Sequence, residues 1–318
     1  MKAQRTADAA SARRPASLLA KPAAASQIRS ARIAKRNKEK LFEMLVYFDE
    51  FCEKHGLRYS LAEGTCLGAV REHDFIPWDD DLDVGMLRSD FDKLFELWDK
   101  HGDKERFSLY RTNKDFCAYV PIGLMRNNST TYIREFEKGL EDRNLGVKID
   151  IAPLDEIPDD PKLRKKQLRY AHFYALFMMG RKPRNKRKKK ILNVGANLLM
   201  DVFRWKWARN LVLKIVEPQV KKYNGTGCSQ VAINGLGIGR GGLWKMTDIT
   251  ELTKIPFHGK EFYVPAEYDD FLTRGYGDYM QRPKVEKRKP YDTPAYYDLN
   301  TPYKEYLKNE KSKEKQEK

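Results

Sequence analysis

The sequence predicts an α+β fold, a mixed β-sheet core with flanking helices, and three patterns carry this prediction. Apolar residues recur at three- and four-residue steps from Leu41 to Cys52, which is typical of an amphipathic helix. Residues 81–86 alternate polar and apolar side chains, as half-buried strands do. Helices and strands mixed in one region favour an α+β or α/β domain over an all-helical one. Further strand-like runs lie at residues 107–110, 118–125, 130–134 and 147–151.

The other elements follow in chain order. The first helix is expected from about residue 33 to Lys54, ended by Gly56, and a short strand is expected at residues 58–62. Residues 160–222 have a helical pattern that a basic run interrupts. Residues 255–282 predict a β-hairpin that turns at His258-Gly259, followed by a short helix.

These elements predict one folded domain at residues 33–300, between a basic flexible tail (1–32) and a charged tail (301–318). Within the domain we expect a core at 41–155, a basic, helical insertion at about 160–222 and a C-terminal motif at 255–283. An apolar content of 41 % is too high for a disordered chain. No apolar run approaches the ~20 residues of a spanning helix, and the N-terminus lacks the apolar stretch of a secretory signal. We therefore expect a cytoplasmic protein, or one peripheral on the inner face of the cell membrane.

The basic character of the chain is local. Residues 1–40 hold eleven basic and two acidic side chains and residues 181–190 hold eight basic ones, against a net charge of +16 for the chain. The rest is therefore close to neutral, and nucleic acid is not expected as a partner on the strength of charge alone. The four cysteines and five histidines form no CxxC, HxH or HExxH spacing, which excludes a zinc hydrolase.

Acidic residues crowd the segment that ends at Asp83. Apolar side chains at residues 75–78, 82 and 84 flank them and predict a partly buried setting, where unpaired carboxylates are costly. On an extended strand Asp81 and Asp83 would share one face, where they would hold Mg²⁺ or Mn²⁺, cations that prefer oxygen ligands. Asp79 is a further candidate ligand. The whole acidic set within twelve residues is Glu72, Asp74, Asp79, Asp80, Asp81 and Asp83.

Two different structures would also account for this acidic segment. A solvated acidic loop is the usual origin of a charge run. A calcium loop would match the spacing of its first three acids. However, Val84 stands where that loop needs glycine, and Asp90 replaces its bidentate glutamate.

Gly64 and Thr65 follow the strand at 58–62 and open a helix. Glycine lets backbone N–H groups approach a phosphate, and the threonine adds a hydroxyl. Asp150, flanked by apolar residues in the run at 147–151, is a candidate third metal ligand or a base for an incoming hydroxyl, and a strand-end cap is the alternative.

Three motifs together closely resemble the LicD family of phosphotransferases. They are Gly64-Thr-x-Leu-Gly-Ala-x-Arg71, Phe75-Ile-Pro-Trp-Asp-Asp-Asp-x-Asp83 and Lys148-Ile-Asp-Ile-Ala-Pro-Leu-Asp155. The block from Phe262 to Pro283 is similar to the closing motif of the family, so the resemblance covers about residues 41–283. It implies a nucleotidyltransferase-like fold and a catalytic domain.

The resemblance also implies roles for individual residues. Gly64 and Thr65 match the phosphate turn, Asp81 and Asp83 the metal pair with Asp79 beside them, and Asp150 the third acid. Arg71 would neutralise phosphate or pair with the acidic cluster. Trp78 would stack on a base or on a choline cation, or pack beneath the loop.

The implied function is Mg²⁺-dependent transfer of phosphocholine, or of a related phospho-alditol or phosphosugar, from a CDP-linked donor such as CDP-choline. The acceptor would be a hydroxyl of a cell-surface glycan or its lipid-linked precursor, and CMP would leave. A nucleotidyltransferase acting on RNA or a small molecule is the first alternative. A non-catalytic basic scaffold that binds membrane or an acidic polymer is the second.

The basic run Arg181–Lys190 precedes an apolar-striped segment, Ile191–Val216, which contains Trp205 and Trp207. A basic cluster beside a Trp-bearing amphipathic helix is typical of docking on an anionic membrane surface. A solvated loop followed by an ordinary core helix would produce the same pattern.

Overall fold

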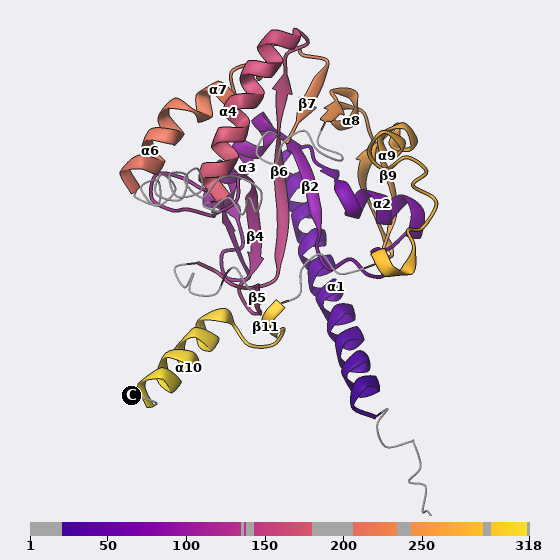
Figure 1. Ribbon diagram of the computed structural model, residues 1–318, viewed down its shortest axis with the longest axis vertical. Coiled ribbons are helices and arrows are strands. Elements are labelled where there is room, and N and C mark those ends of the chain that lie inside the picture. Colours follow the sequence, from indigo (N-terminus) through magenta and orange to yellow (C-terminus); the bar gives the residue numbers. More distant parts are fainter. Residues whose placement is uncertain are drawn as a thin grey trace, which may run out of the picture.

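The computed structural model describes residues 21–134, 137, 143–179, 206–233, 243–288 and 294–316, and these form an α+β fold around a mixed sheet (Figure 1). Five strands lie in the order β1-β2-β6-β4-β3, while β7 pairs with the far end of β6 and β8 pairs with β7. Only β2 and β6 are parallel neighbours among these pairs. The bounds are β1 Ser60–Leu61, β2 Asp83–Leu87, β3 Phe107–Tyr110, β4 Gly123–Asn127, β6 Lys148–Ile157, β7 Gln230–Ala232 and β8 Leu243–Lys245.

Two small antiparallel pairs complete the strands of the described part: β9 with β10, and β5 with β11. Their bounds are β5 Thr131–Arg134, β9 Leu252–Phe257, β10 Lys260–Pro265 and β11 Pro294–Asp298. The helices lie around the sheet, with α4, α6 and α7 gathered at one end and α2 and α9 on one side (Figure 1). They are α1 Lys21–His55, α2 Glu63–Glu72, α3 Arg88–His101, α4 Pro161–Met179, α6 Lys206–Ile215, α7 Glu217–Val220, α8 Thr247–Thr250, α9 Tyr268–Tyr276 and α10 Tyr303–Gln316, with a 3₁₀ turn at Val285–Lys287.

The two faces of the sheet have different chemistry. Gly123 on β4 pairs with Ile151 on β6, and a Cβ at Gly123 would meet the rings of Phe91 and Phe95 on α3. Alternate residues of β2 and β6 on this helix-covered side are therefore apolar and fully buried, among them Val84 and Ile151. The residues between them, Asp83 and Asp150 included, lie on the opposite face. The alternation of side chains along β2 and β6 thus places apolar residues in the core on one face and the acidic residues on the other.

Most of the predicted elements are confirmed. β3 has the predicted bounds, and β5 and β6 begin within one residue of the predicted positions. The hairpin β9–β10 turns at His258-Gly259, which have φ angles of 49° and 88°. Three strands begin at least two residues later than predicted: β1 at Ser60 instead of residue 58, β2 at Asp83 instead of residue 81, and β4 at Gly123 instead of residue 118. Asp81 therefore lies in the loop before β2 and does not share a strand face with Asp83.

Two helices occupy segments that we expected to be tails. α1 begins at Lys21, inside the segment 1–32, and α10 occupies most of the segment 301–318. The residues around positions 23–34 are rich in alanine and arginine, and α10 is rich in lysine and glutamate. All four are strong helix formers, so intrinsic propensity accounts for both helices. None of the helices in the described ranges combines the length and apolarity needed to cross a bilayer.

Candidate active site

Carboxylates converge in the loop between α2 and β2. Asp79, Asp80 and Asp81 are half-buried, and each offers an oxygen within 4.8 Å of an oxygen of the other two. Buried contacts from α1 hold this loop: the Asn37 amide donates to the Asp80 carbonyl oxygen at 3.0 Å, and the Lys38 ammonium donates to the Ile76 carbonyl oxygen at 2.7 Å. The loop is thus fixed by backbone contacts, and three carboxylates remain directed at one point.

Asp83 and Asp150 flank this loop on neighbouring strands. They are register partners in the parallel pair β2–β6, so both side chains leave the sheet on the same face. The Asp150 N–H donates to the Leu82 carbonyl oxygen at 2.9 Å, and the Ala62 N–H donates to the Asp83 carbonyl oxygen at 3.0 Å. Three strands therefore fix the backbone at Asp83. The carboxylates of adjacent strands and of the loop form one acidic cluster.

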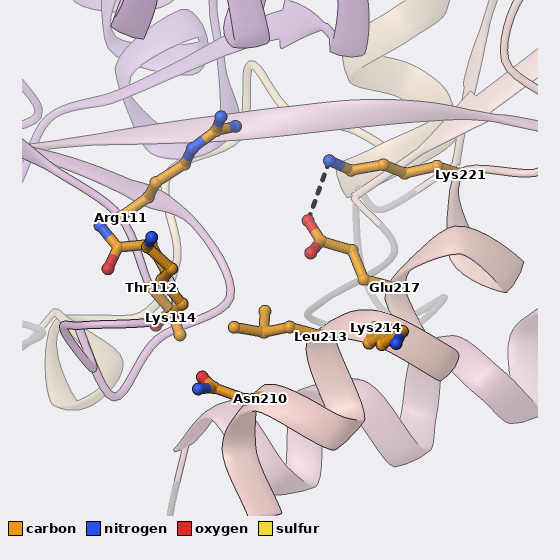
Figure 2. Close-up of a pocket in the computed structure, with 9 residues that line it drawn as sticks. Arg111, Thr112, Lys114, Asn210, Leu213, Lys214, Glu217 and Lys221 are labelled. Atoms are coloured by element: carbon orange, nitrogen blue, oxygen red, sulfur yellow. Dashed lines mark ion pairs between the residues drawn. The ribbon is translucent and has the colours of Figure 1, made fainter. Parts of the chain in front are cut away.

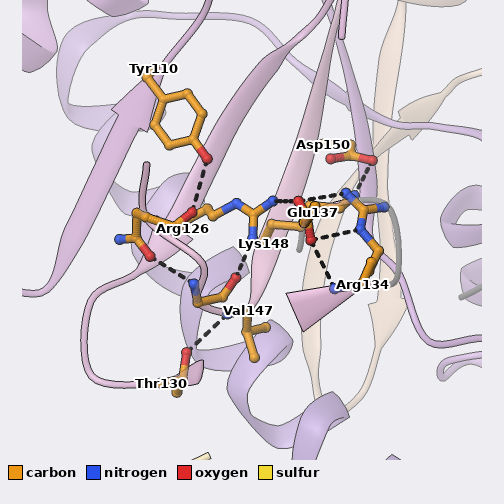
Figure 3. A network of polar contacts seen from close by, with 10 residues as sticks. Tyr110, Arg126, Thr130, Arg134, Glu137, Val147, Lys148 and Asp150 are labelled. Carbon is orange, nitrogen blue, oxygen red and sulfur yellow. Dashed lines mark hydrogen bonds and ion pairs between the residues drawn. The ribbon is translucent and has the colours of Figure 1, made fainter. Parts of the chain in front are cut away.

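One carboxylate oxygen of Asp150 is hydrogen-bonded, and the other has no hydrogen-bond partner in the described part of the chain. Its Oδ2 accepts a hydrogen bond and forms an ion pair with the Lys148 ammonium two residues earlier on the same strand face (Figure 3). Its Oδ1 is buried and has no hydrogen-bond partner in the described part of the chain. An unpaired buried oxygen is costly, and a hard cation would satisfy it. The residues therefore fit a divalent metal ion that prefers oxygen ligands.

Charge crowding shifts the proton affinity of this cluster. Burial, together with the charge of Asp81 and a hydrogen bond to it, raises the pKa of Asp79 to about 8. Burial and the charges of Asp81 and Asp150 raise the pKa of Asp83 well above its usual range. Burial also raises the pKa of Glu63, which accepts a hydrogen bond from the Tyr276 hydroxyl at 3.3 Å. Protons and a metal ion would therefore compete for the same oxygens.

This competition predicts a pH-dependent metal effect. The pKa of the Asp79 carboxyl is about 8 in the folded chain and about 3.9 when unfolded, so between these values the folded state binds the extra proton. The stability of the metal-free protein should fall as the pH rises through that window. Stabilisation by Mg²⁺, measured as a shift in Tm, should accordingly be larger at pH 8 than at pH 6. Asp79→Asn should flatten this dependence, and a Tm shift that is independent of pH would contradict it.

Gly64 and Thr65 lie in the first turn of α2 and contact the acidic cluster directly. A Cβ on Gly64 would come within 2.6 Å of Asp79 Oδ2, so a larger residue there would force that carboxylate to move. The Thr65 Oγ1 accepts a hydrogen bond from the Asp83 N–H at 2.9 Å. Both residues therefore shape the acidic site itself, beside the helix N-terminus that was expected to receive a phosphate.

Arg71 and Trp78 make protein contacts. The Arg71 guanidinium, buried at 5 % exposure, donates to Glu72 Oε1 at 2.8 Å and to the Tyr279 carbonyl oxygen at 2.8 Å. The Trp78 ring packs against the core, with the Arg288 guanidinium over it at 5.1 Å. For Arg71, these contacts match the expected pairing with an acidic residue. For Trp78, they match the expected packing beneath the loop.

The structure adds residues that the sequence pattern left without a role. Lys148 was part of a motif, and the alternation of side chains along β6 places its ammonium on the same strand face as Asp150. Tyr276 lies in the C-terminal motif, and its contact with Glu63 brings α9 to the N-terminal end of α2. Asp155, also in a motif, is fully buried and accepts two hydrogen bonds from Arg88, so its role is structural. Spacing along the sequence carried no signal for the pairing of Tyr276 with Glu63 or of Arg88 with Asp155, which join distant segments.

A mixed α+β sheet with carboxylates on adjacent parallel strands, beside a glycine-containing helix start, is the architecture of a nucleotidyltransferase-type domain. Residues 56–132 match the family model described as LicD/FKTN/FKRP, nucleotidyltransferase domain. These residues form a LicD-type nucleotidyltransferase domain, and the resemblance drawn from the motifs is confirmed. The matched range includes the loop acids and Asp83, whereas Asp150 lies beyond it.

Similarity to a characterised relative extends over most of the chain. The lipopolysaccharide cholinephosphotransferase LicD of Haemophilus influenzae is 28 % identical over 269 residues, which are 80 % of this chain and 94 % of that protein. An uncharacterized protein of Rickettsia typhi is 35 % identical over 65 residues, 20 % of this chain and 21 % of that one. One of Rickettsia prowazekii is 36 % identical over 64 residues, 20 % of this chain and 24 % of that one. The chain thus contains a match to the LicD-type nucleotidyltransferase domain and is similar over most of its length to a cholinephosphotransferase.

Proposed function

We propose that this protein is a Mg²⁺-dependent phosphotransferase of the LicD family that moves phosphocholine, or a related phospho-alditol or phosphosugar, from a CDP-linked donor to a glycan hydroxyl. The observation that carries the proposal is the placement of Asp83 and Asp150 in register beside the loop acids, with one buried Asp150 oxygen unsatisfied. The name of the Haemophilus relative supports choline phosphate as the transferred group and a lipopolysaccharide as the acceptor. Mn²⁺ would suit the same oxygen ligands.

In the proposed reaction the acceptor oxygen forms a bond to the phosphorus distal to cytidine, and the bond from that phosphorus to the bridging oxygen breaks. CMP leaves with the bridging oxygen. A bound divalent cation supplies stabilisation of the charge on the entering and leaving oxygens. Asp79, Asp81 and Asp83 would hold this cation, and the N-terminal turn of α2 would receive the donor diphosphate. The hydroxyl proton would pass to Asp150, whose Oδ1 has no partner among the described residues.

The identity of the donor can be tested by binding. We expect a Mg²⁺-dependent rise in Tm with one CDP conjugate from a panel of CDP-choline, CDP-ribitol, CDP-glycerol, CTP, ATP and GDP-mannose. A ligand at about 100 times its Kd adds about 2.7 kcal/mol to the free energy of unfolding, which is readily measured. Asp81→Asn/Asp83→Asn should lose this rise. Asp99→Asn, whose side chain is 83 % exposed on α3, is the matched control and should keep it.

Each other outcome of the panel would favour a different class of protein. A rise with CTP or ATP and with no CDP conjugate would contradict the proposal and favour a nucleotidyltransferase. If no nucleotide raises the Tm of the folded protein, alone or after addition of a glycan acceptor, the proposal is wrong and a non-catalytic scaffold is favoured.

A further inference from the structure

One side of α6 carries large apolar side chains with high solvent exposure. Trp207, Leu211 and Ile215 are 57 %, 47 % and 55 % exposed, and their four-residue spacing places them in one stripe along the helix. The adjacent side, with Ala208 and Val212, is buried, and Val212 packs against α4. α6 is therefore anchored in the fold and presents an apolar stripe to solvent.

The helices around this stripe are rich in cations, although Asp115 pairs with Lys206 of α6 and Glu217 lines the adjoining cavity. α4 and α6 together span 29 residues, and these include eight lysines and arginines and no acidic residue. α4 exposes apolar side chains as well, at Leu163, Phe173 and Leu176. The two helices pack on one another and lie at the same end of the molecule (Figure 1). Exposed apolar groups gathered on helices that carry cations and no acidic residue are unusual for a surface that faces only water.

A basic cavity of about 400 Å³ lies beside the stripe, between α6 and the loop after β3 (Figure 2). Arg111 and Lys221 in its wall both pair with Asp92, and Lys221 also pairs with Glu217 at 2.9 Å. The other two cations of the wall, Lys114 and Lys214, form no ion pair with any residue that the structure describes. Lys214 lies three residues after Leu211, so the cavity and the apolar stripe adjoin on the helix surface.

We propose that this face of α6 docks on an anionic lipid bilayer. The apolar stripe enters the boundary between head groups and acyl chains, and Lys114 and Lys214 receive the phosphates of lipid head groups. The docking face consists of described residues alone; the basic run 181–190 and Trp205 lie outside the described ranges and are not part of it. Docking is also independent of the proposed reaction.

Other occupants fit these observations less well. A second copy of the chain would bring two predominantly cationic helix surfaces together, which is unfavourable. Nucleic acid would use the lysines, but it gives no role to exposed leucine and isoleucine side chains. A bilayer that carries anionic lipids complements both the charge and the apolar stripe.

Vesicle binding tests the proposal directly. Full-length protein should bind vesicles of phosphatidylcholine with phosphatidylglycerol at least ~10-fold more tightly than vesicles of phosphatidylcholine alone, because each surface cation adds about 1 kcal/mol. Trp207→Ser/Leu211→Ser should weaken binding to the anionic vesicles at least ~10-fold. Lys114→Glu/Lys214→Glu should reduce it to the level of neutral vesicles.

Matched controls separate docking from general surface properties. Met280→Ser/Val285→Ser changes two apolar side chains of 59 % and 69 % exposure elsewhere, and Lys93→Glu/Lys100→Glu changes two exposed lysines of α3. Both should bind vesicles as the unaltered chain does, and all variants should keep its Tm. Equal binding to both vesicle types, or unchanged binding by Trp207→Ser/Leu211→Ser, would overturn the proposal. So would a change confined to oligomeric state, or a loss of vesicle binding in the controls.

Discussion

Asp83→Asn is expected to lower the rate of transfer from the activated donor by about a thousandfold or more, with no loss of fold. The substitution removes the strand-borne carboxylate that faces the loop acids, and a bound metal ion stabilises the transition state by several kcal/mol. A loss of about 4 kcal/mol corresponds to about a thousandfold in rate. Release of CMP from the donor, followed by chromatography at saturating Mg²⁺, measures the effect.

The stability of the same variant gives an independent check. Burial and the charges of Asp81 and Asp150 raise the pKa of Asp83, so its ionised form destabilises the metal-free protein. Asp83→Asn should therefore have a Tm in the absence of metal at least equal to that of the unaltered chain. Asp150→Asn should also lose activity, whereas Asp99→Asn should retain it. Transfer by Asp83→Asn within about tenfold of the normal rate would contradict the assignment of the metal site.

Glu137→Gln is expected to lower the free energy of unfolding by about 3–5 kcal/mol, the largest stability effect of a single conservative change in the described chain. Glu137 accepts hydrogen bonds from Arg126 on β4 and from Arg134 on β5, and all three side chains are buried (Figure 3). Burial alone would raise the pKa of Glu137, but the two arginines lower it to about 2. Without its charge, the buried guanidinium groups of Arg126 and Arg134 both lose their ion pair with Glu137.

Urea denaturation at neutral pH measures this loss. Glu43→Gln is the matched control, because Glu43 pairs with Arg106 at 2.9 Å on the surface and should lose less than about 1 kcal/mol. Since the pKa of Glu137 is depressed, its contribution is present above about pH 4.5 and is lost as the pH falls towards 2. The difference between Glu137→Gln and the unaltered chain should therefore shrink in acid. A difference that persists at low pH would show that packing, and not charge, dominates.

The fold and the acidic site could be predicted from the sequence to the extent that they depend on local patterns. Alternation of polar and apolar residues identified β3, β5 and β6 and the apolar partners of Asp83. The concentration of carboxylates in one partly buried loop identified the candidate metal site, and the motifs identified the family. These features can be predicted because the periodicity of polar and apolar side chains and the spacing of charges depend only on residues close in sequence.

The remainder depends on contacts between distant segments. The register of β2 against β6 decides that Asp83 faces Asp150, and no local pattern encodes it. The approach of Asp79 to Gly64 and the contact of Tyr276 with Glu63 also join segments that are separate in the sequence. The helical structure of residues 21–32 was not predicted for another reason, because a charged, alanine-rich segment fits both a tail and a helix until its neighbours are known.

The loop acids and Asp83 are expected to hold a divalent cation beside Asp150 at the reaction centre, and the proposed activity depends on this above all. The anomalous scattering of Mn²⁺ in crystals grown with CDP-choline locates that ion directly. We expect a peak bound by oxygens of the loop acids and Asp83, within reach of the donor phosphates and facing Asp150 Oδ1. A peak at another site, or a donor bound away from this cluster, would contradict the assignment.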